Sequence, residues 1–465
     1  MKKNEEYEVE IIDTGFKGEG IAKIDGIAVF VPNVLKGEKA KIKILKVTSK
    51  CAYGKLIELI KCSKNRQECD CETYSKCGGC SLRHIKYEET LKMKKQAVET
   101  TLYKMLKKEI NVKDTIGMEN PYYYRNKLQY PVGISQNGDW VMGVFSERTH
   151  TIIPTKECKI QNEISQKIAN EIFENAKTLN IAPYNEKDFS GILRHIIIRI
   201  GLKTDEIMVT LVVNKNEIPN QEILIKNITE KYPQIKTIAK NINKKNTNVI
   251  LGEETEIIYG EGYIYDYLGE FKFKISPMSF YQVNPLQTYK LYSKAIEYAN
   301  LTGKETIFDL YCGIGTIGIF ASKNVKKLYG IETIEQAIED AKENAKINNV
   351  QNAEFFAGDV EKILPELIKT RNLKADVIFI DPPRKGCDEV AIKTILEVEP
   401  ERIVYISCNP ATLARDLKEL EEKYDIIEAT PVDMFGFTRS CWSCHFFKTK
   451  KIVKQVKFNI VFELF

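Results

Sequence analysis

Two short polar segments follow apolar runs late in the sequence, and their residue types could do chemistry. Residues 381–386 read Asp-Pro-Pro-Arg-Lys-Gly, and residues 407–410 read Ser-Cys-Asn-Pro. Both apolar runs are typical of buried parallel strands, whose carboxyl ends form the ligand-binding edge of an open α/β sheet. At such an edge Cys408 can act as a nucleophile, because the backbone amides of a tight loop are expected to lower the pKa of its thiol. The alternative is a buried structural cysteine.

A glycine-rich segment lies before them and indicates a nucleotide site. Residues 309–318 (Asp-Leu-Tyr-Cys-Gly-Ile-Gly-Thr-Ile-Gly) join an expected strand to a helix, where glycines let a ligand approach the backbone. Such a loop alone also suits tight strand–helix packing. Glu332 ends the next expected strand, where a carboxylate can accept both ribose hydroxyls, and Asp359 ends the third. This combination favours S-adenosylmethionine, a methyl donor without a phosphate.

The elements that must position these segments alternate between strand and helix. Apolar runs at 306–310, 327–332, 376–381 and 402–407 are separated by stretches of helical periodicity. We therefore predict an α/β protein whose residues 286–447 form a doubly wound, Rossmann-like domain.

The first part of the chain has other patterns. Residues 1–62 hold short alternating strands with Gly and Pro between them, which predicts a small β-barrel. Residues 63–285 mix strands and helices and predict a central α+β domain. The tail, residues 448–465, is basic and then apolar, and no structure is predicted for it.

Cysteine usage and hydropathy bear on the compartment. The 465 residues contain no apolar run of about 18 residues that could span a membrane, and no apolar segment of a signal peptide follows the charged start. We expect a cytoplasmic protein without membrane contact, and nothing predicts an obligate protein partner. Four of the twelve cysteines crowd together in a reducing compartment, which indicates a metal or cluster site: Cys69, Cys71, Cys77 and Cys80.

The net charge of +5 is modest, but its distribution is uneven. Residues 36–66 contain ten Lys or Arg and only two acidic residues, Glu38 and Glu58. A local basic stripe suits a polyanion such as RNA, although a solvated lysine face would read the same way.

Four motifs, in this order, resemble the RNA 5-methyluridine methyltransferases, the family of the 23S rRNA and tRNA uracil-C5 enzymes. They are Phe-Tyr-Gln-Val-Asn at 280–284, Asp-Leu-Tyr-Cys-Gly at 309–313, and the segments that begin at 381 and 407. The resemblance implies S-adenosylmethionine-dependent methylation of uracil C5 in RNA through a covalent bond between Cys408 and uracil C6. It also implies the residues that contact the methyl donor: Gln282, Tyr311, Glu332 and Asp381.

The cysteine segment also matches this family. By the resemblance, a 4Fe–4S cluster has four thiolate ligands: Cys71, Cys77, Cys80 and Cys158. Zinc is the alternative, since tetrahedral sulfur ligation suits it too, and Cys69 and Cys62 are nearby substitutes.

The first 60 residues resemble a TRAM domain, an RNA-binding barrel. With the cluster, this favours the 23S rRNA branch over the tRNA branch. Basic residues of the central region are candidates for the RNA path, although each could be ordinary surface charge: Arg125, Lys127, Arg148, Arg194 and Arg199.

The resemblance breaks near the end. Where the family has a glutamate that removes the C5 proton, this chain has Trp442, which cannot accept a proton. One explanation is a reading-frame change, since a shifted frame can encode a near-family sequence over residues 440–447. A catalytically impaired RNA-binding iron–sulfur protein is the second candidate. A third, an enzyme that methylates an exocyclic amine, needs no thiol, and Arg384 and Cys408 count against it.

Overall fold

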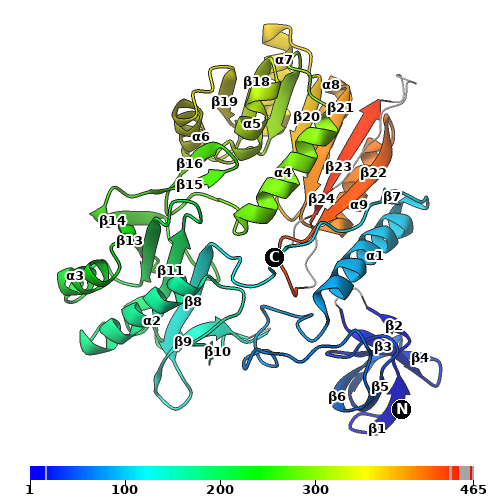
Figure 1. The fold of residues 1–465 in the computed structure, drawn as a ribbon, viewed down its shortest axis with the longest axis vertical. Coiled ribbons are helices and arrows are strands. Elements are labelled where there is room, and N and C mark those ends of the chain that lie inside the picture. Colours follow the sequence, from blue (N-terminus) through cyan, green and yellow to red (C-terminus); the bar gives the residue numbers. More distant parts are fainter. Residues whose placement is uncertain (16–17, 148, 439–441, 450–460, 463–465) are drawn as a thin grey trace.

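The computed structural model describes all of the chain except residues 16–17, 148, 439–441, 450–460 and 463–465. Its N-terminal part is a six-stranded sheet with the order β1-β5-β6-β4-β3-β2. In β5 the apolar residues Ala40, Ile42 and Ile44 are buried between lysines, as period-two alternation requires. β1 also contacts β3, so the sheet curls on itself (lower right in Figure 1). The strands are β1 (Glu6–Glu10), β2 (Asp13–Thr14), β3 (Gly20–Ile24), β4 (Ile27–Val31), β5 (Lys39–Val47) and β6 (Cys51–Lys61).

The middle of the chain forms a seven-stranded sheet with the order β10-β9-β8-β11-β12-β13-β14. Helix α2 (Glu163–Thr178) packs across β11 and β8 (Figure 1), and every residue of β11 and β12 is buried. The Asn162 side chain begins α2 by accepting hydrogen bonds from the backbone N–H groups of Ile164 and Ser165. The other elements are α1 (Tyr87–Leu106), β8 (Lys127–Ile134), β9 (Trp140–Phe145), β10 (Ile152–Pro154), β11 (Leu193–Ile200), β12 (Ile207–Val213), α3 (Gln221–Lys231), β13 (Ile235–Ile242) and β14 (Glu254–Gly260).

The last part is a doubly wound α/β domain, as predicted. Its sheet has the order β19-β18-β17-β20-β21-β24-β23-β22-β7, and β17 to β21 are parallel. The strands are β7 (Asn111–Val112), β17 (Thr306–Leu310), β18 (Lys327–Glu332), β19 (Ala353–Ala357), β20 (Val377–Ile380), β21 (Arg402–Ser407), β22 (Tyr424–Val432), β23 (Trp442–Thr449) and β24 (Val461–Phe462). The helices are α4 (Pro285–Ala299), α5 (Thr316–Ala321), η1 (Ser322–Asn324), α6 (Glu335–Ile347), α7 (Val360–Arg371), α8 (Glu389–Val398) and α9 (Pro410–Leu420).

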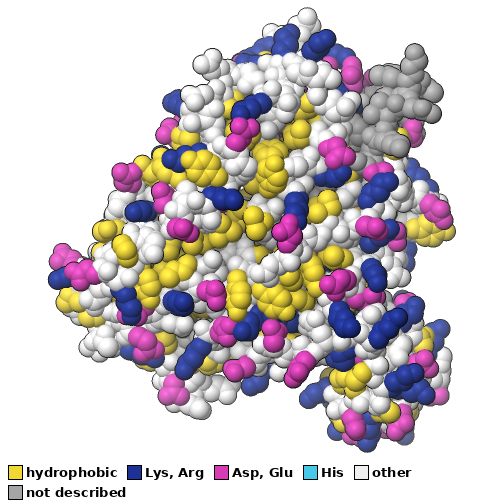
Figure 2. Space-filling view, in the orientation of Figure 1, with side chains coloured by type: hydrophobic (Ala, Val, Ile, Leu, Met, Phe, Trp, Pro, Cys, Tyr) yellow, Lys and Arg dark blue, Asp and Glu magenta, His cyan; other side chains and the backbone are white. Residues whose placement is uncertain are grey.

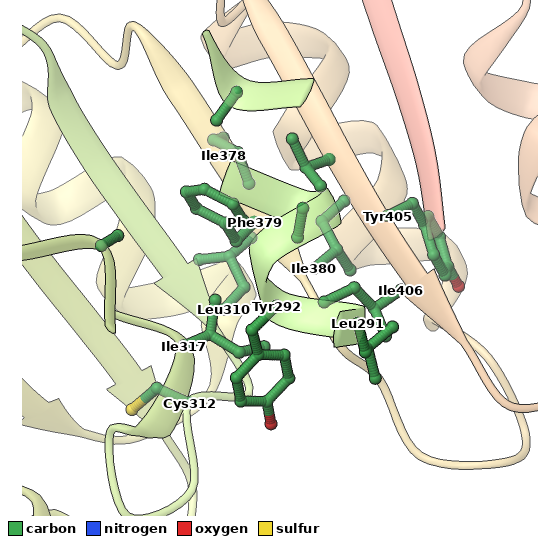
Figure 3. Packing of buried hydrophobic residues seen from close by; sticks show 14 of the residues in the cluster. Leu291, Tyr292, Leu310, Cys312, Ile317, Ile378, Phe379, Ile380, Tyr405 and Ile406 are labelled. Carbon is green, nitrogen blue, oxygen red and sulfur yellow. The ribbon is translucent and has the colours of Figure 1, made fainter. Parts of the chain in front are cut away.

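Helix α4 covers the strands that carry the candidate site. Its Leu291 and Tyr292 belong to the same buried cluster as Leu310 of β17, Ile380 of β20 and Ile406 of β21 (Figure 3). A hairpin of β15 (Ile264–Leu268) and β16 (Phe271–Ile275) contributes to the same core. The strand ends that hold the candidate residues are thus fixed from one face by close packing.

Two early elements dock on this late domain. Helix α1 packs against α9, and β7 pairs in parallel with β22 at the sheet edge. The domain boundaries at 62, 285 and 447 remain predictions. In the described part of the chain, no helix combines the length and apolar character needed to cross a bilayer.

Candidate active site

Cys408 lies between the end of β21 and the start of α9. Its side chain is buried, with 7% exposed, and it takes part in no disulfide. Asn409 begins α9 by accepting a hydrogen bond from Ala411 N at 3.0 Å, and Pro410 stands in the first turn. The Asn409 N–H donates to Ser407 Oγ at 3.1 Å. Cys408 therefore lies directly before the N-terminus of α9, at the carboxyl edge of the sheet.

Hydrogen bonds join the Cys408 loop to the segment that follows β20. Asn409 Nδ2 and Thr412 Oγ1 both donate to the Arg384 carbonyl, at 3.5 and 3.3 Å. Arg415 Nη2 donates to the Cys387 carbonyl at 2.9 Å. The two motifs separated in sequence are therefore held against each other at the carboxyl edge of the sheet.

Two carboxyl groups lie near the ends of neighbouring strands, Asp309 fully buried and Asp381 half-buried. Burial raises the pKa of Asp381 well above its usual range, and the charge of Asp309 adds to this. Burial also raises the pKa of Asp309 to about 7, against a hydrogen bond from the Gly318 N–H that lowers it, while Glu332 raises it further. The Asp381 N–H donates to the Leu310 carbonyl at 3.4 Å, which fixes the two strand ends together.

In the glycine loop, Gly313 borders open space, whereas Gly315 is packed against other side chains. Gly313 and Gly315 have φ of 53° and 80°. A Cβ added to Gly315 would meet Phe355 at 3.1 Å, whereas one added to Gly313 would meet open space. The Glu332 carboxylate accepts from Gly313 N at 3.2 Å beside that space. Positive φ favours glycine at both positions, packing adds a second reason at Gly315, and Gly313 borders open space in which a ligand would fit.

The other residues predicted to contact the methyl donor lie on separate segments of the chain. Tyr311 follows β17 with φ of 63° and shares a hydrogen bond with the Cys387 thiol. Gln282 is buried in the segment that leads into α4, and its carbonyl accepts from Asn126 Nδ2 at 3.1 Å. Asp359, after β19, pairs with Lys362 at 2.5 Å. The Asp309 Oδ1 atom is buried without a hydrogen-bond partner among the described residues, so it is available to accept a hydrogen bond from a bound ligand.

The sequence did not reveal a buried polar network beside the site. Asp433 pairs with Lys94 and accepts from Tyr87 Oη at 2.7 Å. Gln287 Nε2 donates to the Asp433 carbonyl at 2.9 Å, and Asn284 Nδ2 donates to the Met434 carbonyl at 3.0 Å. The network ties α1 and the 280–284 motif to the chain after β22. Its sequence signal was that Asn284 falls in the 280–284 motif.

The predicted cluster cysteines come from two distant segments. The Gly79 N–H donates a hydrogen bond to Cys77 Sγ at 3.2 Å. The backbone of Cys77 forms an isolated antiparallel β-bridge with that of Ser146. Burial, with the charges of Cys158, Cys77 and Cys71, raises the pKa of Cys80 to about 12, against a lowering by Arg83. No three His, Cys, Asp or Glu side chains of the described residues are already arranged around a metal position.

The basic residues predicted to line the RNA path differ in burial and in hydrogen bonding. Arg194 is buried and donates to the Asn243 and Lys245 carbonyls, at 2.6 and 3.0 Å. Arg199 is buried and donates to two other carbonyls. The prediction that these two line the RNA path is therefore wrong, because both side chains are buried and hydrogen-bonded to backbone carbonyls inside the fold. Arg148 and the side chain of Trp442 lie outside what the structure describes.

The exposed basic stripe is on the N-terminal domain. Figure 2 shows dark-blue side chains over that domain at lower right, interspersed with acidic ones. Several lysines of β5 and β6 are exposed there: Lys39, Lys46, Lys55 and Lys61.

Comparison with known proteins agrees with this geometry. The family model of tRNA (uracil-5-)-methyltransferases matches residues 86–450, and the TRAM domain model matches residues 2–57. An uncharacterised RNA methyltransferase of Clostridium acetobutylicum is 49% identical over 442 residues, 94% of this chain and 96% of the relative. One of Halalkalibacterium halodurans is 46% identical over 440 residues, again 94% of this chain and 96% of the relative.

A solved structure agrees as well. The Pyrococcus abyssi tRNA (uracil-54, C5)-methyltransferase in complex with S-adenosyl-L-homocysteine is 26% identical, with a TM-score of 0.75. The match covers 95% of this chain and 99% of that one. The chain is therefore an S-adenosylmethionine-dependent RNA methyltransferase with a TRAM domain, and it belongs to the tRNA (uracil-5-)-methyltransferase family.

Proposed function

We propose that the chain methylates carbon 5 of uracil in 23S rRNA, and that Cys408 forms a covalent bond to the base during the reaction. The observation that carries the proposal is the position of Cys408. Its thiol lies at the start of α9, in a loop hydrogen-bonded to the segment that begins with Asp381. Uracil C5 is a weak nucleophile, and a neighbouring thiolate is the group that can activate it.

In the proposed reaction, Cys408 Sγ adds as a thiolate to uracil C6. The π pair of the C5=C6 double bond then forms a C4=C5 double bond, and the π pair of C4=O4 moves to O4 to give an enolate. C5 then forms a bond to the methyl group, and the leaving sulfur keeps the electron pair of the broken S–CH₃ bond. A base takes the C5 proton, and the released electron pair expels the Cys408 thiolate. The uracil must leave its stack for C6 to reach the thiol.

The methyl donor supplies an electrophilic carbon attached to a positively charged sulfur. In the proposal, the Glu332 carboxylate holds the ribose, and Gln282 hydrogen-bonds the methionine moiety. Tyr311 packs against the donor, and Asp381 lies between donor and uracil. The open space at Gly313 and the unpaired Asp309 Oδ1 support this arrangement.

The choice of 23S rRNA rests on the TRAM domain together with the cysteine cluster, and a tRNA substrate is the alternative. The Pyrococcus abyssi protein of similar fold is a tRNA methyltransferase by name, which keeps that alternative open. The deciding experiment incubates the purified full chain with unmodified 23S rRNA and tRNA, and measures 5-methyluridine by mass spectrometry of nucleosides. Product in 23S rRNA supports the proposal, and product in tRNA alone selects the alternative. The absence of product in both RNAs, together with the absence of a methylated adduct on Cys408, would contradict uracil-C5 methylation.

We also propose that a 4Fe–4S cluster binds Cys71, Cys77, Cys80 and Cys158, in a protein of the reducing cytoplasm. Polar atoms near these thiols support it: the hydroxyl groups of Tyr124 and Tyr130 are buried without a partner among the described residues, as donors to a buried anionic group would be. Such a cluster would tie the 71–80 segment to Cys158. Anaerobic purification followed by iron, sulfide and zinc analysis tests it, with C158A as the variant that should lose iron. Stoichiometric zinc without sulfide would select the zinc alternative.

A catalytically impaired protein is the second candidate, because Trp442 stands where the family has its proton-accepting glutamate. In that case methylated adduct would accumulate on Cys408, and the first cycle would stall before 5-methyluridine is released. Counting 5-methyluridine per enzyme separates the two: many products per enzyme exclude impairment. Reading the gene around codon 442 tests the frame change directly.

A further inference from the structure

Arg125 and Lys127 are two cationic side chains near the start of β8, and neither forms an ion pair with an Asp or Glu among the described residues. Lys127 is the first residue of β8 and Arg125 lies two residues before it, close enough for its charge to act on the Lys127 ammonium. Arg199 of β11 stands directly opposite Lys127 in the antiparallel register. Like charges in such a cross-strand position destabilise a sheet.

The third cation is already satisfied. Arg199 donates from Nη1 to the Tyr281 carbonyl at 3.1 Å and from Nη2 to the Ser279 carbonyl at 3.3 Å. Arg199 is thus a structural residue, because it fixes the backbone at the start of the 280–284 motif.

Arg125 and Lys127 are not satisfied. Both side chains are half-buried, and among the described residues neither charged group has a carboxylate or carbonyl partner. The Arg125 Nε atom is buried without a hydrogen bond, and its guanidinium lies over the Phe435 ring at 5.5 Å. Burial, with repulsion from Arg199 and Arg125, lowers the pKa of Lys127 to about 7. A fold retains such an arrangement where a bound anion completes it.

The pair borders the candidate active site. Asn126, between the two cations, donates from its N–H to the Val283 carbonyl at 2.8 Å and from Nδ2 to the Gln282 carbonyl at 3.1 Å. Phe435, under Arg125, is tied to Asp433 through its N–H at 3.2 Å. An anion held by the pair would therefore lie next to the segment that carries Gln282.

We propose that Arg125 and Lys127 bind a phosphate of the RNA strand beside the target uridine. The inference rests on the proposed RNA substrate and adds the residues that position its backbone. A guanidinium offers paired donors to phosphate oxygens, and an ammonium adds a point charge. The alternative anion for this pair is the carboxylate of the methyl donor S-adenosylmethionine. Both cations remain partly exposed, which favours a polymer that approaches from outside.

The test is a binding measurement that needs no methylation. Fluorescence anisotropy gives the Kd of a fluorescein-labelled oligouridylate at several KCl concentrations for the wild type, K127Q and R125Q. We expect each variant to bind about tenfold more weakly, with the slope of log Kd against log salt reduced by about 0.7. K167Q, which removes an exposed lysine of α2, is the matched control and should reproduce the wild type. Unaltered RNA affinity and salt slope in K127Q and R125Q would overturn the proposal.

Calorimetry with S-adenosylhomocysteine distinguishes the two anions. Unchanged affinity in K127Q supports the RNA phosphate, whereas loss of S-adenosylhomocysteine binding with intact RNA binding overturns it in favour of the donor carboxylate. Without RNA, K127Q should unfold at the same urea concentration as the wild type or a higher one, because repulsion is removed. These results do not depend on Cys408, so weaker RNA binding by K127Q would stand even if no 5-methyluridine formed.

Discussion

Lys94 and Asp433 form an ion pair although 339 positions separate them in the chain, and their side chains are only 2% and 0% exposed. Lys94 Nζ also donates to the Phe435 carbonyl at 3.0 Å. The pair fastens helix α1 to the chain after β22, which borders the candidate active site. Neither charge has water to replace its partner.

Removing one partner should therefore destabilise the protein strongly. K94M is expected to lower the free energy of unfolding by about 3–5 kcal/mol, because Asp433 would remain charged and buried. K92M is the matched control, since Lys92 forms an exposed pair with Glu89 on the same helix, and it should change stability by less than about 1 kcal/mol. Urea denaturation measures both. Equal effects of the two substitutions would show that the buried pair is not needed.

Asp309 should make stability depend on pH. Its pKa is about 7 in the fold but ordinary in the unfolded chain, so between pH 4 and 7 the folded protein holds a proton that the unfolded chain has released. Stability should fall as pH rises through this window. From pH 5 to 8 the contribution is about 2–3 kcal/mol. Urea unfolding of D309N should show a pH dependence smaller by that amount, and an unchanged dependence would refute the assignment.

The two loop glycines should fail in different ways when replaced by alanine. G315A should lose about 1–3 kcal/mol of stability, because its Cβ would crowd Phe355 and Ala341. G313A carries only the strain of positive φ, about 1 kcal/mol, but its Cβ would enter the space proposed for the donor. Thermal unfolding and calorimetry with S-adenosylhomocysteine separate the two effects. Full affinity in G313A would mean that the donor binds elsewhere.

RNA affinity should fall at alkaline pH if Lys127 binds a phosphate. The charged and titratable neighbours that shift Lys127 are Arg199 and Arg125, which stay protonated throughout. Above pH 7 the ammonium loses its proton, and binding must then take one up, so affinity should fall by at most about tenfold per pH unit. K127R keeps its charge and should flatten the profile between pH 7 and 9. A profile identical to that of the wild type would exclude Lys127 as the titrating group.

The late strands were predictable because local pattern decides them. Residues 306–310 and 402–407 are continuous apolar runs, and both are buried parallel strands in the structure. Glu332 ends its strand as predicted. Such runs fit no other position in an α/β sheet.

The contacts between segments far apart in the chain could not be predicted from the sequence. The docking of α1 on α9 and the Lys94–Asp433 pair depend on how distant segments meet, which no local periodicity encodes. Arg194 looked like an RNA contact because a basic residue in a strand carries no mark of the carbonyls that it bonds. The segment 442–449 had no strand prediction, yet it pairs with both β21 and β22.

The most direct test of the account is to trap Cys408 on its substrate. RNA with 5-fluorouridine at the target carries fluorine at C5, which no base can remove as a proton, so the adduct should persist whether or not Trp442 replaces the family's glutamate. With S-adenosylmethionine present, the wild type and C51A should each give a denaturation-resistant protein–RNA species, and peptide mass spectrometry should place a methylated nucleotide on Cys408. Absence of this species, its persistence in C408A, or attachment to another residue would contradict the covalent mechanism.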